Sequence, residues 1–430
     1  MEFQLIVNLY LLEVSTQEGA ILSAKKEQLW TPKYAVILLN MLCNGMAGMM
    51  TFPIVAKYAL SVGANLTVAS AIAGMMSLVA LVVCPFAGVL CDKGSRKHIL
   101  IVANLGYGIS FALHCVCASI PALIAVRMAT GVFFSLCTVA NVAYSSAYIP
   151  KSRTGEGMGY VGLSTVIAQA LGPMVGMELQ EIGGYSLTFL AAGGFTFLCV
   201  LLLVLLPYPV TYSTGKAQKG VRLKELFAAR FTCFMLMALL FSSAGGLIST
   251  YLAIIADVRQ IADITMYFTV FSILSLALRP VTGRVLDSRG IFCLIIPAFL
   301  GCGFCMIFVG IGKALFMFLI ASVFGAIGQG TGLPSIQAHC IKTVDKASAG
   351  VATSTIMIGQ NIGNAIAPIV GSFFIGAFSY EAAFAGAGIF IMIAGTLLTL
   401  VQWKIGRKYS GQCQKNNTRC QESSGFTAEK

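Results

Sequence analysis

The chain has 430 residues, of which 57% are hydrophobic and only 10% are charged. A soluble globular domain carries about 25% charged residues, so this composition excludes one. The mean hydropathy is +0.86, and many windows exceed the roughly 18 apolar residues that indicate a membrane-spanning helix. These values predict an all-α integral membrane protein that crosses the bilayer many times.

The net charge of +12 raises the question of a nucleic-acid partner. Most of the 28 Lys and Arg residues, Arg279 among them, fall in one set of alternate loops and in the terminal segments. The other loops hold only Lys57, Arg259 and Lys313, and Arg127 lies inside a span. Cytoplasmic loops of membrane proteins carry such an excess of basic residues. We therefore expect both termini in the cytoplasm and no nucleic-acid partner.

Residues 1–32 form an N-terminal extension ahead of the first span. Phe3, Ile6, Leu9 and Leu12 recur at helical spacing, with acidic residues between the apolar ones. The stretch lacks the positive n-region and the cleavage site of a secretory signal peptide. We expect an interfacial helix, and a start codon assigned too far upstream is the alternative.

Twelve apolar segments follow the extension. They predict transmembrane helices at about 34–56, 66–90, 98–118, 121–146, 158–178, 185–206, 231–255, 264–286, 291–311, 314–337, 348–376 and 381–403. The basic cytoplasmic loop 208–230 separates one six-helix bundle, 33–207, from a second, 231–404. The remaining residues, 405–430, form a polar cytoplasmic tail that we expect to lack fixed structure.

The polar stretch 85–97 between two spans recurs in part at 280–290, at an offset of 195 residues. The offset extends to later spans, and it pairs Pro85 with Pro280, Gly88 with Gly283, Asp92 with Asp287, Gly155 with Gly350, Pro173 with Pro368 and Gly176 with Gly371. A fixed internal period indicates a duplicated structural unit. Because each copy holds an even number of spans, the copies share one orientation, and they predict two pseudo-symmetric bundles around a midplane cavity.

At this point the sequence resembles the major facilitator superfamily. The stretch 85–97 resembles its G-x-L-x-D-x-x-G-R-K signature, although Gly94 and Ser95 fall outside the usual register. Residues 127–131, Arg-Met-Ala-Thr-Gly, resemble its R-x-x-Q-G pattern, and 159–177 resembles the antiporter motif with Ala168 and Met177 in place of two glycines. The resemblance implies twelve transmembrane helices in two six-helix bundles and alternating access. It also implies a cavity lined by the first, fourth, seventh and tenth spans.

The signature implies a cytoplasmic latch that stabilises only one state of the transporter, as a switch requires. Its residues here are Gly88, Asp92, Arg96 and Lys97, with Arg96 within reach of Asp92 across one helical turn. Gly283 and Asp287, the latter with Arg284, form a weaker second copy. A solvated turn with topogenic basic residues is the alternative interpretation.

The spans contain one clear charge, Arg127, which we interpret as a coupling residue. Charges inside a span are costly and usually face the bundle interior or water. Proton coupling and attraction of an anion are the functional interpretations, and a structural hydrogen bond is the alternative. His114 in the preceding span is a possible proton carrier, although a packed neutral histidine is the more common finding.

Small residues and proline in the fifth and eleventh spans predict helices at the bundle interface. Gly172 and Gly176 share one face and permit close approach of another helix, and Pro173 bends the helix. The full set is Gly159, Gly172, Pro173, Gly176, Pro368 and Gly371. A tight helix contact without a role in transport is the alternative.

Three amides are candidates for lining the cavity: Asn40 and Asn44 on one face of the first span, and Gln329 in the tenth. Polar groups in hydrocarbon need partners, so this face looks inward. Hydrogen bonding between helices is the alternative role.

We therefore expect a secondary active transporter rather than an enzyme, with protons and a small amphipathic or cationic substrate as its partners. Proton-coupled efflux is the leading hypothesis, and a proton- or sodium-coupled importer of a metabolite is the alternative; a non-transporting sensor is disfavoured. No metal or cofactor is expected, and no ATP, because the G-x4-G-K-[ST] motif is absent. We expect a monomer in the plasma membrane, a bacterial inner membrane, surrounded by lipid.

Overall fold

The computed structural model describes residues 29–117, 119–150, 153–206, 231–343 and 349–425. The described residues form helices and no strand. The helices are α2 (Pro32–Ser61), α3 (Leu66–Lys93), α4 (Arg96–His114), α5 (Ile120–Ser145), the short 3-10 turn η1 (Ser146–Tyr148), α6 (Thr154–Leu205), α7 (Thr232–Val258), α8 (Met266–Arg289), α9 (Phe292–Ile311), α10 (Leu315–Lys342), α11 (Ala349–Ala377) and α12 (Tyr380–Gly425). Residues 1–28 of the extension, where an interfacial helix is expected, and the whole of the loop 208–230 lie outside the described residues.

Among the described residues, ten helices are long and apolar enough to cross a membrane. One of them, α6, has 52 residues and is broken by non-helical backbone at Gly183 and Gly184. Gly184 has φ of +73°, a conformation that glycine adopts without the steric cost other residues incur. Each arm of α6 is long enough for a crossing, which takes about 20 residues. The arms correspond to the spans predicted at 158–178 and 185–206.

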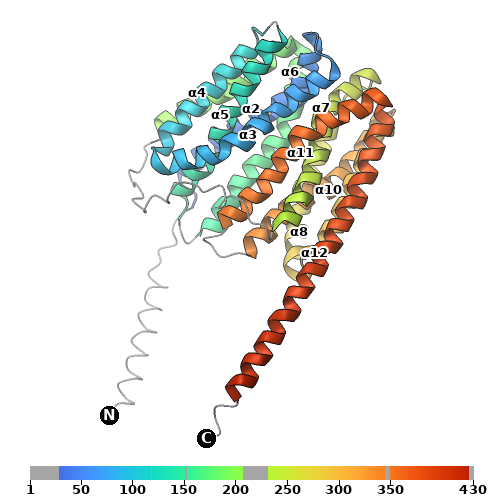
Figure 1. The fold of residues 1–430 in the computed structure, drawn as a ribbon. Helices are drawn as coiled ribbons and strands as arrows, with labels where there is room; N and C mark the ends of the chain where they lie inside the picture. Colours follow the sequence, from blue (N-terminus) through green and yellow to red (C-terminus); the bar gives the residue numbers. More distant parts are fainter. Residues whose placement is uncertain (1–28, 118, 151–152, 207–230, 344–348, 426–430) are drawn as a thin grey trace.

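The helix ends differ from the sequence prediction in two places. Pro85 and Pro280 lie inside α3 and α8, so the polar stretches 85–97 and 280–290 are largely helical rather than loops. At the C-terminus, α12 continues to Gly425, well past the predicted end of the last span (Figure 1). Once a span has nucleated the helix, each further residue adds a hydrogen bond at little cost, so the polar segment can continue it.

The helices form two bundles (Figure 1). The N-terminal bundle contains α2–α6, and the C-terminal bundle contains α7–α12. Small residues bring helix backbones together in both. A Cβ on Gly176 of α6 would lie 2.8 Å from Met50 Cα of α2, and a Cβ on Gly363 of α11 would lie 3.0 Å from Ser243 N of α7. Such close packing replaces the hydrophobic effect as the source of helix association in lipid.

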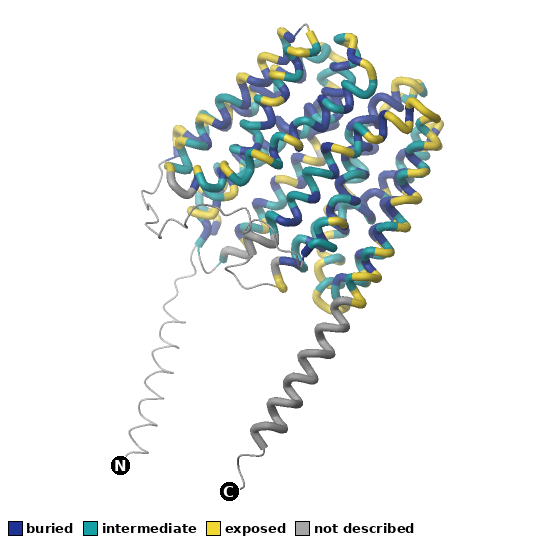
Figure 2. Tube along the Cα trace, viewed as in Figure 1, coloured by how far each residue is buried: buried dark blue, intermediate teal, exposed yellow. Residues whose placement is uncertain are grey.

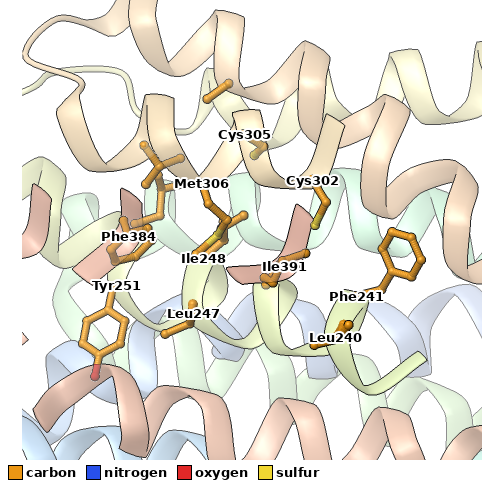
Figure 3. Packing of buried hydrophobic residues seen from close by; sticks show 14 of the residues in the cluster. Leu240, Phe241, Leu247, Ile248, Tyr251, Cys302, Cys305, Met306, Phe384 and Ile391 are labelled. Atoms are coloured by element: carbon orange, nitrogen blue, oxygen red, sulfur yellow. The ribbon is translucent and has the colours of Figure 1, made fainter. Parts of the chain in front are cut away.

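Buried residues lie between the helices of each bundle, and exposed residues lie along the outside (Figure 2). Many of the exposed side chains are large and apolar. Phe86 and Phe373, for example, are 71% and 63% exposed. In the C-terminal bundle, Phe241 of α7 stacks on Phe299 of α9 with ring centroids 4.2 Å apart. Both rings belong to a cluster of buried apolar residues, and Figure 3 shows part of it, including Cys302, Cys305 and Met306. An apolar exterior around a packed interior is what a bilayer requires.

Candidate functional site at the interface between the bundles

The two ends of the bundles carry different connections. We call the end with the turns 62–65, 259–265 and 312–314 the far face. We call the end where α2 begins and α12 leaves the bundle the termini face, which also carries the turns 94–95 and 290–291. Among the described residues, the termini face carries Lys33, Arg96, Lys97, Arg153, Arg284, Arg289 and Lys342. The positive-inside rule therefore predicts that this face is cytoplasmic.

Two helix pairs carry much of the contact between the bundles: α3 with α11, and α6 with α8. A Cβ on Gly74 of α3 would lie 2.5 Å from Ala365 O and 3.0 Å from Ala365 Cα of α11. Across the other pair, Thr269 Oγ1 lies 3.3 Å from Met174 Sδ. The 195-residue offset maps Gly74 onto Thr269 and Ala365 onto Ala170. Met174 is one helical turn from Ala170, so the helix pair α6–α8 corresponds to the pair α11–α3 in the repeat.

Tyr251 of α7 joins three helices near the far face. Its side chain is fully buried, and its hydroxyl donates to Pro368 O of α11 at 2.6 Å. The same hydroxyl lies 2.6 Å from Ser70 Oγ of α3. Nearby, Ser372 of α11 donates to Thr67 Oγ1 of α3 at 3.2 Å. Figure 3 shows the Tyr251 ring at the edge of the apolar cluster with its hydroxyl directed away from it.

An ion pair joins the bundles at the far face. Lys57 Nζ of α2 lies 2.7 Å from Asp257 Oδ2 of α7, and it also donates to Gln180 Oε1 of α6 at 3.5 Å. The Lys57 side chain is 13% exposed and that of Asp257 is 57% exposed. Such a half-exposed pair contributes roughly 0.2–1 kcal/mol, which is enough to bias two conformations of similar energy.

Reversing one charge of this pair is expected to open the far face. In Lys57→Asp, the pair becomes repulsive and the far-face contact loses about 1 kcal/mol, roughly a five-fold change in the ratio of conformations. The double variant Lys57→Asp/Asp257→Lys restores the attraction and the ratio. The ratio is measured from spin-label distances across the far face. Arg153→Asp is the matched control, since it breaks the pair with Glu156 inside one bundle; an equal shift in that variant would contradict the assignment.

Apolar contacts between the bundles also gather near the far face. The cluster around Tyr251 and Leu252 includes Ile54, Ala56, Ala73 and Met177, four N-terminal residues from the far half of their helices. The other clusters of described residues contain the N-terminal bundle alone, including the two nearest the termini face. The polar contacts described above also lie in the far half. Within the described residues, the bundles are therefore joined at the far face and separate toward the termini face.

The residues predicted as a latch lie at the termini face, and their contacts stay within the N-terminal bundle. Arg96 Nη1 donates to Ala143 O of α5 at 3.0 Å, and Lys97 Nζ donates to Leu206 O at 2.6 Å. The side chain of Asp92 lies outside the described residues, so its expected pairing with Arg96 stays a prediction. A Cβ on Gly88 would meet nothing within 4 Å.

The second copy of the latch differs from the predicted pairing. Asp287 of α8 forms an ion pair with Lys342 at the end of α10, rather than with Arg284. Both side chains are more than half exposed, and both belong to the C-terminal bundle. Gly283, like Gly88, has open space where a Cβ would be. Neither copy bridges the bundles through its described side chains in this conformation.

The predicted interface helix α6 uses its glycines mainly inside its own bundle. A Cβ on Gly172 would lie 3.1 Å from Met49 C and 3.2 Å from Met50 N of α2. Pro173 lies within α6, and Met174 next to it faces α8. Gly159 has open space around it, whereas Gly371 of α11 packs against Leu247 and Tyr251 of α7. Pro368 supplies the carbonyl that Tyr251 binds.

Two of the predicted cavity amides bind other helices of the N-terminal bundle. Asn40 Nδ2 donates to Asn141 Oδ1 of α5 at 2.7 Å, and Asn44 Nδ2 donates to Asn104 Oδ1 of α4 at 2.7 Å. Both are buried, so in this conformation they have the interhelical role. Gln329 of α10 is half-buried and lies 3.5 Å from Phe241 O of α7.

Arg127 lies wholly inside the N-terminal bundle rather than at the interface. Its Nε donates to Ile72 O of α3 at 3.4 Å, and neither Nη nitrogen has a hydrogen-bond partner among the described residues. Tyr107 OH and His114 Nε2 of α4 are buried in the same way without described partners. Unsatisfied buried polar groups are costly, so this cluster is a reason to keep Arg127 as a coupling candidate.

Sequence reasoning missed two features of the interface. The Lys57–Asp257 pair joins residues 200 positions apart, and no local motif marks such a contact. Arg279 was counted with the basic residues of the cytoplasmic loops, although the span predicted at 264–286 contains it. In the structure it lies inside α8, ten residues before the end of the helix at Arg289. The predicted span was itself the available signal that Arg279 belongs to a helix.

Comparison with known proteins identifies a family model and several relatives that match most of the chain. The model of the Major Facilitator Superfamily matches residues 37–314 and 299–412. The multidrug resistance efflux pump PmrA of Streptococcus pneumoniae is 24% identical over 331 residues, 74% of this chain and 82% of that protein. The multidrug resistance protein MdtG of Serratia proteamaculans is 22% identical over 324 residues, 72% of this chain and 77% of that protein.

Solved structures agree on the fold. The crystal structure of the nucleoside transporter NupG superposes with a TM-score of 0.68 at 11% identity. The superposition covers 87% of this chain and 99% of that one. At this identity the likeness concerns the arrangement of helices alone.

Proposed function

Because the chain belongs to the major facilitator superfamily, we propose that it is a secondary active transporter that works by alternating access. The observation that carries this proposal is the one-sided interface, with the bundles joined at the far face and separate toward the termini face. With the termini face in the cytoplasm, the structure represents the inward-open state. In the described part of the chain, ten helices are long and apolar enough to cross the membrane, and α6 is one of them. In this account α4 crosses as well and the two arms of α6 cross separately, which makes twelve transmembrane helices.

The second state follows from rocking the bundles about α3–α11 and α6–α8. Gly74 and Gly88 of α3 are 14 residues apart, about four helical turns, so they share one face. Gly74 meets α11 in the structure, and Gly88 meets nothing. In the outward-open state the contact at Gly74 is released and the region of Gly88, Asp92 and Gly283 closes instead. The latch residues act in that state.

We assign the direction as efflux of small amphipathic compounds in exchange for protons, across a bacterial inner membrane. The similarity to PmrA and MdtG, which are named for drug efflux and drug resistance, supports export. Import of a metabolite with a proton or sodium ion is the alternative. Arg127, buried beside Tyr107 and His114, is the proposed coupling site.

Transport by reconstituted protein tests this function. In liposomes with an imposed pH gradient, we expect a panel of fluorescent amphiphiles to move against the proton flux and to stop moving when the gradient is collapsed. Arg127→Met should leave substrate binding intact and remove the dependence on the gradient. Its thermal stability should be unchanged or higher, because an apolar side chain replaces a buried charge.

Three outcomes distinguish the hypotheses. Transport in the direction of the proton flux would assign symport and import. Gradient-dependent transport by Arg127→Met at the wild-type rate would contradict the coupling role. No movement of any panel compound, with protein that remains folded, would leave proton antiport without support.

A further inference from the structure

Arg279 is a charged residue near the middle of α8, a membrane-spanning helix at the interface between the bundles. It is the fourteenth residue of α8, which has 24 residues and runs from Met266 to Arg289. At 1.5 Å per residue it lies about 20 Å from the far end and about 15 Å from the termini end. A bilayer core is about 30 Å thick. Charges at such depth face the interior of the protein or a water-filled pathway rather than lipid.

The face of α8 that carries Arg279 is polar and turned toward protein. Thr269, Ser272, Ser275 and Arg279 recur at spacings of three and four residues, so they form one stripe. Thr269 contacts Met174 of the N-terminal bundle, and a Cβ on Gly330 of α10 would lie 3.0 Å from Ser275 Cβ. The stripe therefore faces the space between α10 and α6.

The opposite side of α8 is apolar. Ile273 and Val281 are 62% and 54% exposed, which suits contact with lipid. Ser272 lies on the polar stripe and is buried, whereas Arg279, about two turns farther on, is exposed. Its place on the stripe, one turn after Ser275, directs the exposed Arg279 toward the region where the bundles separate, with the exposed Leu276 beside it. No hydrogen bond or ion pair holds its guanidinium among the described residues.

The described carboxylates of the interface helices lie near helix ends. Glu178 and Glu181 lie toward the far face, whereas Glu156 and Asp287 lie toward the termini face, where Arg153 and Lys342 pair with them.

We propose that Arg279 binds an anionic group of the substrate, and that the transported compounds are amphipathic carboxylates rather than cations. This inference rests on the proposed transport function and specifies its substrate class. A guanidinium matches a carboxylate with two parallel hydrogen bonds, and a low-dielectric surrounding strengthens the attraction. A cationic substrate would meet a like charge halfway along the pathway.

Binding of three fluorescent probes to purified full-length protein tests the proposal. The probes are fluorescein, which carries a carboxylate, ethidium, which is a cation, and an uncharged pyrene alcohol. Wild-type protein is expected to bind fluorescein most tightly. Arg279→Gln should weaken that binding by about 10- to 100-fold, and Arg279→Lys by less, because lysine keeps the charge without the planar fork. Ethidium binding should be unchanged or stronger in Arg279→Gln.

Arg284→Gln is the matched control, because it removes a basic residue from the same helix nearer the termini face and should leave fluorescein binding unchanged. Preference of the wild type for ethidium, failure to bind fluorescein, or unchanged binding in Arg279→Gln would each overturn the proposal. Normal fluorescein binding with lost transport in Arg279→Gln would also overturn it and assign the residue to the conformational change. If one of those results is obtained and the protein still transports ethidium or the pyrene alcohol, the proposed transport function stands and only the anion site is contradicted.

Discussion

Replacing Gly74 by leucine is expected to remove the far-face closure and abolish transport. A Cβ at this position would lie 2.5 Å from Ala365 O and 3.0 Å from Ala365 Cα, and backbone cannot move aside as a flexible side chain can. Overpacking of this kind costs typically 1–3 kcal/mol. A cost of about 2 kcal/mol changes the ratio of the two states roughly 30-fold. Each bundle keeps its own core, so the protein should fold.

Transport of the best substrate in proteoliposomes and the spin-label distance across the far face measure this effect. Gly194→Leu is the control, since Gly194 is exposed and has nothing within 4 Å of its Cβ position. It should transport normally. Normal transport by Gly74→Leu would mean that α3 and α11 do not need to approach each other at Gly74 during the cycle.

Replacing Gly88 by leucine is expected to trap the opposite state. The structure has open space at Gly88, so the side chain costs nothing here and improves helix propensity by up to about 1 kcal/mol. Thermal stability should therefore be equal or higher than that of the wild type. In the outward-open state, α3 and α11 approach each other at the termini face, and the leucine would lie between them. Transport should fall at least ten-fold while substrate binding from the termini face is retained.

Thermal unfolding, binding and transport of the same Gly88→Leu preparation provide the test. Gly283→Leu, its counterpart in the second copy, should have the same direction of effect. Full transport by both variants would contradict closure of the termini face at these positions. A large loss of thermal stability would show instead that the glycines are needed for folding.

The internal repeat allowed much of the fold to be predicted. An offset of 195 residues relates the helix pair α3–α11, in contact at Gly74 and Ala365, to the pair α8–α6, in contact at Thr269 and Met174. Hydropathy indicated the helices because lipid contact requires long apolar segments. The α6 helix also fits, since its break at Gly183 and Gly184 separates the two predicted spans.

The contacts that decide the conformation were harder to predict. Asn40 and Asn44 look alike in the sequence whether they line a cavity or bind Asn141 and Asn104. Only the packing of α2 against the other helices distinguishes these two roles. Arg279 was counted with the cytoplasmic basic residues even though the predicted span 264–286 contains both it and Pro280. A proline can lie inside a membrane helix when neighbouring helices satisfy the freed backbone groups. The Lys57–Asp257 pair depends on the relative placement of two bundles, which no single segment encodes.

Two spin-label distances measured on the same preparation test the central claim most directly. One pair, at positions 61 and 260, spans the far face, and the other, at 147 and 288, spans the termini face. The labels are attached to an encoded keto amino acid, which avoids the native cysteines.

Alternating access predicts reciprocal changes. Gly74→Leu should lengthen the 61–260 distance and shorten the 147–288 distance, whereas Gly88→Leu should keep the first short and the second long. Distances that stay fixed in both variants while transport is lost, or that lengthen together at both faces, would contradict the account.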